Sequence, residues 1–234
     1  MNVALIGYGK MGKTIEEILL ERGHNILVKL NQTPTAEDLR NVDVAIEFSK
    51  PEVAFENLKA LISNNVPTIC GTTGWLNYLE EIKTLNEQHD NAFLYGSNFS
   101  LGVNLFFELN AHLAKLISDY NQYNVEIEEI HRTQKLDAPS GTAITLAEGI
   151  IENSAKLNWE LDGNSENEII PIFAKRIENV PGTHTVSYIS EVDTIEIKHT
   201  AHTRKGFALG AVIAAEWIVD KKGFFSMKDV LGLK

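Results

Sequence analysis

Proton-handling and cationic side chains gather at the end of one alternating stretch of the sequence. Residues 125–130 alternate apolar and polar side chains, which predicts a half-buried β-strand. His131, Arg132 and Lys135 follow this strand. Histidine titrates near neutral pH, and a nearby lysine can supply a proton, so His131 and Lys135 form a candidate acid–base pair. A cationic group beside such a pair is typical of a site for an anionic substrate.

A turn and a helix start follow this cluster. Pro139 lacks an N–H group and has a fixed φ, and Ser140 or Thr142 can cap an apolar helix expected over residues 143–151. The free N–H groups and the positive end of a helix dipole favour a bound carboxylate. The residues from 126 to 143 therefore predict a substrate site, and the alternative is a surface turn with scattered charge.

A glycine motif near the N-terminus predicts a nucleotide site. An apolar strand over residues 2–6 precedes a GxGxxG sequence, which a helix over 13–22 and a strand over 25–30 follow. This is the context that the dinucleotide motif requires. The residues expected to contact the cofactor are Gly7, Tyr8, Gly9, Lys10, Met11 and Gly12. The alternative is a glycine-rich turn without a ligand.

The end of the second strand bears on the choice of nucleotide. An acidic residue at this point would hold the ribose 2′-hydroxyl of NADH, but the sequence has Lys29, Leu30 and Asn31. No carboxylate repels a 2′-phosphate there, and Lys29 could attract one. We therefore expect NADPH to be favoured and NADH to be usable, unless Lys29 and Asn31 both simply face solvent.

The first hundred residues alternate strands and helices. Further strands are expected over 42–48, 67–70 and 92–95, with helices over 52–64 and 78–88 between them. This alternation predicts a Rossmann-type, doubly wound parallel sheet. A Gly-Thr-Thr-Gly loop after the fourth strand lies where such a sheet binds its ligand, although an ordinary strand-to-helix turn is the alternative.

Beyond residue 100 the strands are no longer interleaved with helices. A helix is expected over 105–118, and Asn104 is expected to cap it, the alternative being that Asn104 reaches the site. A second helix is expected over 144–152, and a polar loop over 153–167. Strands over 169–176, 183–191 and 193–201 predict a second α+β domain with an open mixed sheet. A helix over 207–219 returns to the first domain, and a short helix follows over 224–231. We therefore expect a dinucleotide-binding domain of residues 1–99 and 207–234 and a substrate-binding and oligomerisation domain of residues 100–206.

Composition excludes several classes of function. The net charge of −11 argues against a nucleic-acid partner, and the sequence has no apolar run long enough to span a membrane. The single cysteine, Cys70, rules out an internal disulfide, and with no signal peptide in view we expect a cytoplasmic protein. His199 and His202 form an H-x-x-H sequence, but on a strand they face opposite ways, so no metal site is expected.

Several of these segments resemble one family. The run of His131, Lys135 and residues 137–143 resembles the signature of the 4-hydroxy-tetrahydrodipicolinate reductase (dihydrodipicolinate reductase) family of lysine and diaminopimelate biosynthesis. Residues 96–104 resemble the family's segment at the domain junction. One departure stands out, because the family pattern begins with two adjacent histidines and Arg132 occupies the second place.

The resemblance implies roles for further residues. It implies that His131 is the general acid/base, that Lys135 is the main proton donor and that the enzyme is a homotetramer. It also places two loops at the cofactor, and these comprise Gly71, Thr72, Thr73, Gly96, Ser97, Asn98 and Phe99. The substrate contacts expected are Arg132, Lys135, Ser140, Gly141, Thr142 and Arg204.

Other functions remain as alternatives. A non-catalytic NAD(P)-sensing protein would need the glycine motif but not the His131–Lys135 pair. A different two-domain dehydrogenase, acting on an aldehyde or an amino acid, is also compatible with the pattern. A thiol mechanism is disfavoured because Cys70 ends a buried strand, and a hydrolase because Ser140 lacks a G-x-S-x-G sequence.

Overall fold

The computed structural model describes residues 1–164, 168–203 and 205–233. The chain divides into two compact units: unit 1 contains residues 1–104 and 204–234, and unit 2 contains residues 105–203. The domain boundaries expected above remain a prediction. Among the described residues, every helix is too short or too polar to span a bilayer.

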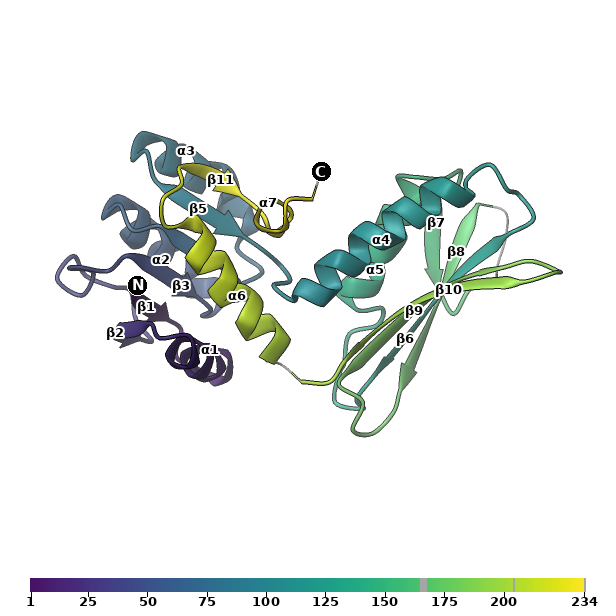
Figure 1. The fold of residues 1–234 in the computed structure, drawn as a ribbon, viewed down its shortest axis with the longest axis horizontal. Helices are drawn as coiled ribbons and strands as arrows, with labels where there is room; N and C mark the ends of the chain where they lie inside the picture. The colour runs from purple at the N-terminus through teal and green to yellow at the C-terminus, as the bar shows by residue number, and fades with distance from the viewer. Residues whose placement is uncertain (165–167, 204, 234) are drawn as a thin grey trace. The chain divides into compact units, whose positions relative to one another are not determined.

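Unit 1 is a parallel sheet with helices on both faces (Figure 1). Its strand order is β11-β5-β4-β3-β1-β2, so the order reverses beside β1. A doubly wound sheet of this kind binds ligands at the carboxyl ends of the strands next to that reversal. The strands are β1 (Asn2–Ile6), β2 (Asn25–Leu30), β3 (Val44–Glu47), β4 (Thr68–Cys70), β5 (Ala92–Tyr95) and β11 (Gly223–Phe225).

The helices of unit 1 bury apolar faces on this sheet. Leu5 and Ile46 of the strands and Ile15 and Leu19 of a helix lie in one fully buried core. A second core lies on the opposite side around Leu58, and the two together hold the sheet between two helical layers. The helices are α1 (Lys10–Glu21), α2 (Pro51–Ser63), η1 (Leu76–Tyr78), α3 (Leu79–Gln88), α6 (Lys205–Ile218) and α7 (Met227–Leu231).

Helix α6 brings the end of the chain back to unit 1. It is rich in small residues, and a Cβ atom at Gly210 would lie 1.7 Å from the carbonyl oxygen of Phe99. Glycine is therefore required for α6 to approach the segment of Phe99. The short strand β11, which then pairs in parallel with β5, falls in a stretch where the sequence predicted only a helix.

Unit 2 is a mixed sheet whose core is shared with helices α4 and α5 (Figure 1). The strand order is β10-β9-β6-β8-β7; β8 is parallel to β6 and β7, and β9 is antiparallel to β6 and β10. The doubly wound sheet of unit 1 and this open mixed sheet confirm the expected fold class. The elements are α4 (Leu101–Ile117, which begins in unit 1), β6 (Asn124–His131), α5 (Gly141–Ile151), β7 (Asn158–Leu161), β8 (Ile169–Arg176), β9 (Gly182–Ile189) and β10 (Thr194–Ala201).

The structure corrects two expectations for this region. Helix α4 begins at Leu101, so Asn104 is not the cap. It lies inside the first turn, and its side-chain amide donates to the backbone oxygens of Asn98 and Ser100. Strand β7 lies within residues 153–167, which were expected to form a loop. Parallel pairing with β8 stabilises this strand, whose polar sequence by itself gives little signal for a strand.

Candidate active site

Strand β6 carries the centre of the candidate site on its buried face. Val125, Ile127, Glu129 and His131 point to the same side of the sheet, and all four are buried. The two apolar residues pack into the core of unit 2 beneath α4 and α5. Because side chains two residues apart point to the same face of a strand, the carboxylate of Glu129 and the imidazole of His131 lie on the same face as Val125 and Ile127.

Strand register brings two distant residues to this carboxylate. Pairing between β6 and β9 sets Glu129 opposite His184, and pairing between β6 and β8 sets His131 opposite Arg176. The His184 ring lies edge-on to the His131 ring, with 5.0 Å between centroids. Glu129, Arg176 and His184 carried no functional prediction from the sequence. The one local signal was an acidic residue on the apolar face of a predicted strand.

Glu129 is fully buried and accepts hydrogen bonds at both oxygens. Its Oε2 accepts the backbone N–H of Ser140 at 3.0 Å, and its Oε1 accepts Nη2 of Arg176 at 3.2 Å. Burial by itself raises the pKa of Glu129, but the contacts with His184, Ser140 and His131 outweigh it and lower that pKa to about 2. The carboxylate is therefore ionised throughout the physiological pH range.

His131 is held neutral in the free protein. Burial is the main cause that lowers its pKa to about 4, with a further contribution from repulsion by His184, and attraction by Glu129 only partly opposes them. Its Nδ1 atom lies 3.6 Å from Oε2 of Glu129, and that nitrogen has no hydrogen-bond partner among the described residues.

Lys135 lies on the loop between β6 and α5. Its ammonium group is partly exposed and donates to the Asp137 carboxylate at 2.6 Å. Arg176 of β8 fixes the loop, because its guanidinium donates to the backbone oxygens of Lys135 and Asp137. Arg176 thus fixes the backbone of Lys135 near the end of β6, and the ammonium group of the lysine remains partly exposed.

The loop ends at the N-terminus of α5, where the expected cap is confirmed. The Ser140 hydroxyl accepts the backbone N–H of Ala143 and lies 3.1 Å from Nε2 of His184. With both contacts made, this hydroxyl is buried and engaged within the protein. Gly141 is exposed and Thr142 half-buried, whereas the N–H groups of Ser140 and Ala143 at this positive helix end already donate to Glu129 and to the Ser140 hydroxyl.

The remaining expected substrate contacts differ in position. Arg132 is exposed at the start of the loop, one residue beyond the buried His131. Arg204 lies outside the described residues. In unit 2 the structure therefore brings together His131, Lys135 and residues 140–142, while the roles of these residues remain predictions.

Three atoms of the cluster raise the question of a metal. Glu129, His131 and His184 each offer a ligand atom, and these atoms lie within 4.8 Å of one another. Both oxygens of Glu129 already accept hydrogen bonds, and Nε2 of His184 lies at the Ser140 hydroxyl. These contacts compensate the buried charge, so we interpret the group as a hydrogen-bonded cluster.

The glycine motif of unit 1 has the geometry that a dinucleotide needs. A Cβ atom at Gly7 would lie 2.0 Å from the Phe48 carbonyl oxygen, and one at Gly12 would lie 2.5 Å from the Gly7 oxygen. At Gly9 the same position meets nothing within 4 Å. Gly7 and Gly12 thus close the turn and pack the helix, and Gly9, exposed at the N-terminus of α1, leaves room for a phosphate.

Lys29 is not a free cation at this site. Its ammonium group donates to Glu16 of α1 at 2.5 Å and lies over the Tyr8 ring. The Tyr8 hydroxyl donates to the same carboxylate, and the hydrogen bond from Lys29 is the main cause that lowers the pKa of Glu16. Asn31 accepts the Tyr8 backbone N–H at 2.7 Å, so the end of β2 and the glycine loop are joined.

The two other expected cofactor loops also lie at the carboxyl edge of the unit 1 sheet. The buried Thr72 hydroxyl after β4 accepts the N–H of Ser49 after β3, and Gly71 packs directly on the Phe48 ring. Phe99 is buried beside the same ring, while Thr73 and Ser97 are exposed. Lys10 and Met11 lie in the first turn of α1.

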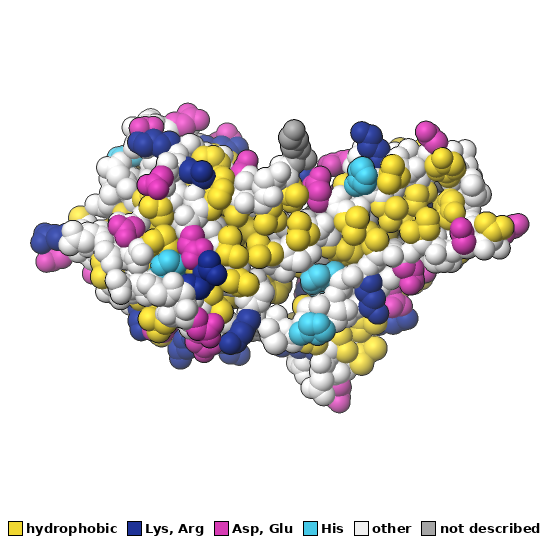
Figure 2. Space-filling view, in the orientation of Figure 1, with side chains coloured by type: hydrophobic (Ala, Val, Ile, Leu, Met, Phe, Trp, Pro, Cys, Tyr) yellow, Lys and Arg dark blue, Asp and Glu magenta, His cyan; other side chains and the backbone are white. Residues whose placement is uncertain are grey.

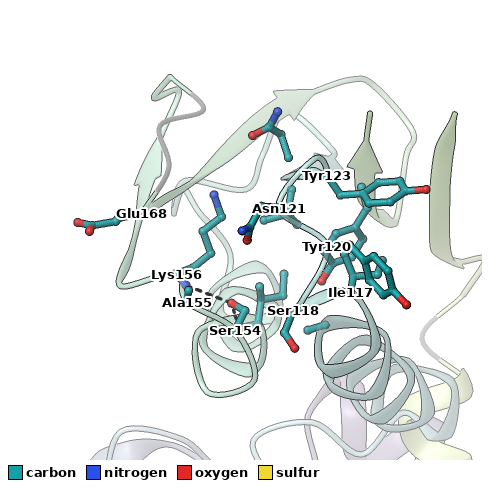
Figure 3. Close-up of a pocket in the computed structure, with 14 residues that line it drawn as sticks. Ile117, Ser118, Tyr120, Asn121, Tyr123, Ser154, Ala155, Lys156 and Glu168 are labelled. Carbon is teal, nitrogen blue, oxygen red and sulfur yellow. Dashed lines mark hydrogen bonds between the residues drawn. The ribbon is translucent and has the colours of Figure 1, made fainter. Parts of the chain in front are cut away.

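A pocket of about 420 Å³ opens elsewhere in unit 2 (Figure 3). It lies at the C-terminal end of α4 and the start of β6, and its lining includes Tyr120, Tyr123 and Lys156. Val125 in its wall is six residues from His131, or about 20 Å along an extended strand. The pocket is therefore separate from the loop that carries Lys135.

Comparisons with known proteins agree with this layout. The family profile described as "Dihydrodipicolinate reductase, N-terminus" matches residues 1–99, and that described as "Dihydrodipicolinate reductase, C-terminus" matches residues 102–231. The 4-hydroxy-tetrahydrodipicolinate reductase of Christiangramia forsetii is 56% identical over 99% of this chain and 98% of its own.

The chain belongs to the dihydrodipicolinate reductase family. The reductase of Rickettsia rickettsii is 37% identical over 98% of both chains. The dipicolinate-bound dihydrodipicolinate reductase of Paenisporosarcina sp. TG-14 has the same fold, with a TM-score of 0.80 at 24% identity over 98% of this chain and 99% of that one. The resemblance found in the sequence is thus confirmed along its whole length.

Proposed function

We propose that this member of the dihydrodipicolinate reductase family reduces 4-hydroxy-tetrahydrodipicolinate to tetrahydrodipicolinate with NAD(P)H, in lysine and diaminopimelate biosynthesis. The observation that carries the proposal is the convergence of His131, Lys135 and the N-terminus of α5 in unit 2. The relatives named above support it, because their names state this activity.

The residues of unit 2 suit a dianionic substrate. We assign its carboxylates to the N–H groups of Gly141 and Thr142, to the Lys135 ammonium and to Arg132, and the Ser140 hydroxyl holds the helix cap in place. Asp137 competes for Lys135 in the free protein and would be displaced by a substrate carboxylate. Arg204 is proposed as a further substrate contact by resemblance alone.

Lys135 is the proposed proton donor, and His131 the proposed general acid/base. The His131 imidazole is neutral in the free protein at pH 7. Two substrate carboxylates placed beside it would raise its pKa, because nearby negative charge favours the protonated form. His131 then becomes able to hold and release a proton when substrate is bound.

The cofactor residues of unit 1 are proposed to hold NADPH or NADH. The pyrophosphate fits at Gly9 and the N-terminus of α1, and the nicotinamide end is assigned to the loops of residues 71–73 and 96–99. The bound nicotinamide supplies the hydride. No acidic residue ends β2, which favours NADPH, but Glu16 neutralises Lys29, so we expect both nucleotides to be used.

We also propose a cytoplasmic homotetramer. In unit 2 the strands β10 and β7 are open edges of the sheet. Hydrophobic side chains gather over α4 in Figure 2, and Leu105, Leu109 and Leu116 of that helix are each at least half exposed. Association of subunits would cover such surfaces, and light scattering of the purified protein measures the assembly.

The deciding experiment is an assay of nucleotide oxidation. Condensing pyruvate with aspartate semialdehyde in place generates the substrate, and the purified protein is then given NADPH or NADH. Oxidation that depends on the condensation product is expected. Cofactor binding without oxidation of either nucleotide would contradict the proposal and favour a sensing protein or a different dehydrogenase.

A further inference from the structure

The buried carboxylate of Glu129 joins three parts of the candidate site. It contacts the imidazole of His131 on its own strand, the N–H of Ser140 at the start of α5, and the guanidinium of Arg176 on β8. Arg176 in turn holds the backbone of the Lys135 loop. One fully buried group is thus common to the acid/base, the anion-binding helix end and the proton donor.

The geometry at His131 specifies what this carboxylate can do. Nδ1 of His131 is buried without a partner among the described residues, and Glu129 Oε2 lies 3.6 Å away. A shift of a few tenths of an ångström makes a charge-assisted hydrogen bond from Nδ1–H. An imidazole that carries its proton on Nδ1 leaves Nε2 as the nitrogen that exchanges protons.

We propose that Glu129 is a positioning residue that holds His131 in the tautomer with the proton on Nδ1 and, through Arg176, fixes the loop of Lys135. The kinetic part of this inference rests on the proposed reductase activity, whereas the tautomer can be measured without it. His184 completes the arrangement, because its Nε2 lies at both the Ser140 hydroxyl and Glu129, at 3.1 and 3.7 Å.

The charged groups around His131 set the expected pH dependence. Glu129 on β6 stabilises the protonated imidazole, whereas His184 on β9, Arg176 on β8 and Lys135 on the loop oppose it. Replacing Glu129 by glutamine removes the negative charge that, among the described residues, favours the protonated imidazole. We therefore expect the kcat–pH limb that reports His131 to move to lower pH, with kcat reduced about 10- to 100-fold at pH 7.5 and KM for NADPH unchanged.

Nitrogen-15 NMR of the imidazoles tests the structural part directly. In the wild-type protein we expect His131 to be protonated on Nδ1 at pH 7.5, and in Glu129→Gln to lose this preference. Glu128→Gln is the matched control, since Glu128 lies next in the chain on the opposite face and pairs with the partly exposed Lys175. That variant should keep both the wild-type tautomer and the wild-type pH profile.

Several results would overturn the inference. A wild-type His131 protonated on Nε2 would do so even if Glu129→Gln failed to fold. A folded Glu129→Gln with unchanged tautomer and pH profile would also do so. If treatment with EDTA changed the wild-type imidazole signals, the cluster would be a metal site. If the wild-type protein showed the expected tautomer but oxidised neither nucleotide, the proposed function would be contradicted. The proposed role of Glu129 in positioning His131 would still stand.

Discussion

Lys135 combines an accessible charged end with a backbone that Arg176 holds in place. This arrangement suits a group that must approach a substrate repeatedly in the same position, because a fixed loop loses little entropy when the substrate binds. His131 differs, since it is buried and neutral in the free protein and depends on its neighbours for its protonation state. The structure thus gives the proposed proton donor, Lys135, an accessible charged group, and it surrounds the proposed general acid/base, His131, with charged neighbours.

Replacing Lys135 by alanine should lower kcat by about two orders of magnitude or more, the usual scale for loss of a proton donor. Steady-state kinetics with NADPH measures the effect. Lys175→Ala is the matched control, because this partly exposed lysine on β8 pairs with Glu128 on the opposite face of the sheet. A near-normal kcat in Lys135→Ala would remove the lysine from the mechanism.

Glu16 should influence the choice of nucleotide. Glu16→Gln removes the negative charge that neutralises Lys29, so we expect kcat/KM for NADPH to rise relative to NADH by about fivefold, or roughly 1 kcal/mol. Glu17→Gln, the exposed neighbour on α1, provides the control. If Lys29→Ala leaves the ratio of the two nucleotides unchanged, Lys29 takes no part in the selection.

At the scale of the elements, α5 is tied to the sheet at its first turn. Ser140 supplies its N-cap and contacts His184 of β9, while its backbone N–H donates to Glu129 of β6. The helix end proposed to bind a carboxylate is therefore fixed by two strands. A helix terminus held this way presents its N–H groups in one orientation.

Ser140→Ala should weaken this anchoring. We expect the free energy of unfolding to fall by about 1–2 kcal/mol, the usual cost of losing an N-cap, and KM for the substrate to rise because the first turn loosens. Urea denaturation and steady-state kinetics measure the two effects. Ser118→Ala, which removes an exposed hydroxyl after α4, should leave both values near those of the wild type. An unchanged KM in Ser140→Ala would separate the cap from substrate binding.

For the whole molecule, the buried cluster makes stability sensitive to acid. The folded-state pKa of His131 is about 4, below the ordinary value of 6.5, so the unfolded chain binds this proton more readily as the pH falls from 6.5 to 4. Glu129, with a folded-state pKa of about 2 against 4.5, adds a further loss of stability at lower pH. Both shifts favour unfolding in acid.

We therefore expect the free energy of unfolding to fall by on the order of 1–3 kcal/mol between pH 7 and pH 4.5. Urea denaturation followed by circular dichroism at several pH values measures this slope. His131→Gln should flatten it in this window, and His112→Gln, which changes an exposed histidine on α4, should not. An equal slope in the wild type and in His131→Gln would contradict the assignment.

The features that the sequence determined by itself are local ones. The glycines of the first loop, the Ser140 cap and the closeness of His131 to Lys135 depend on residues a few positions apart. Alternation of strands and helices likewise predicted the sheet of unit 1, and a group of strands without helices between them predicted the sheet of unit 2. The short strands β7 and β11 were missed, because their pairing partners lie elsewhere in the chain and give them most of their stability.

Only the tertiary structure decided the surroundings of His131. Glu129 lies two residues away, but Arg176 and His184 reach it through the registers of β6 with β8 and β9. A shift of either register by one residue would turn those side chains to the opposite face of the sheet. The sequence thus specified which groups could handle a proton, and long-range strand pairing decided which guanidinium and which second imidazole lie around them.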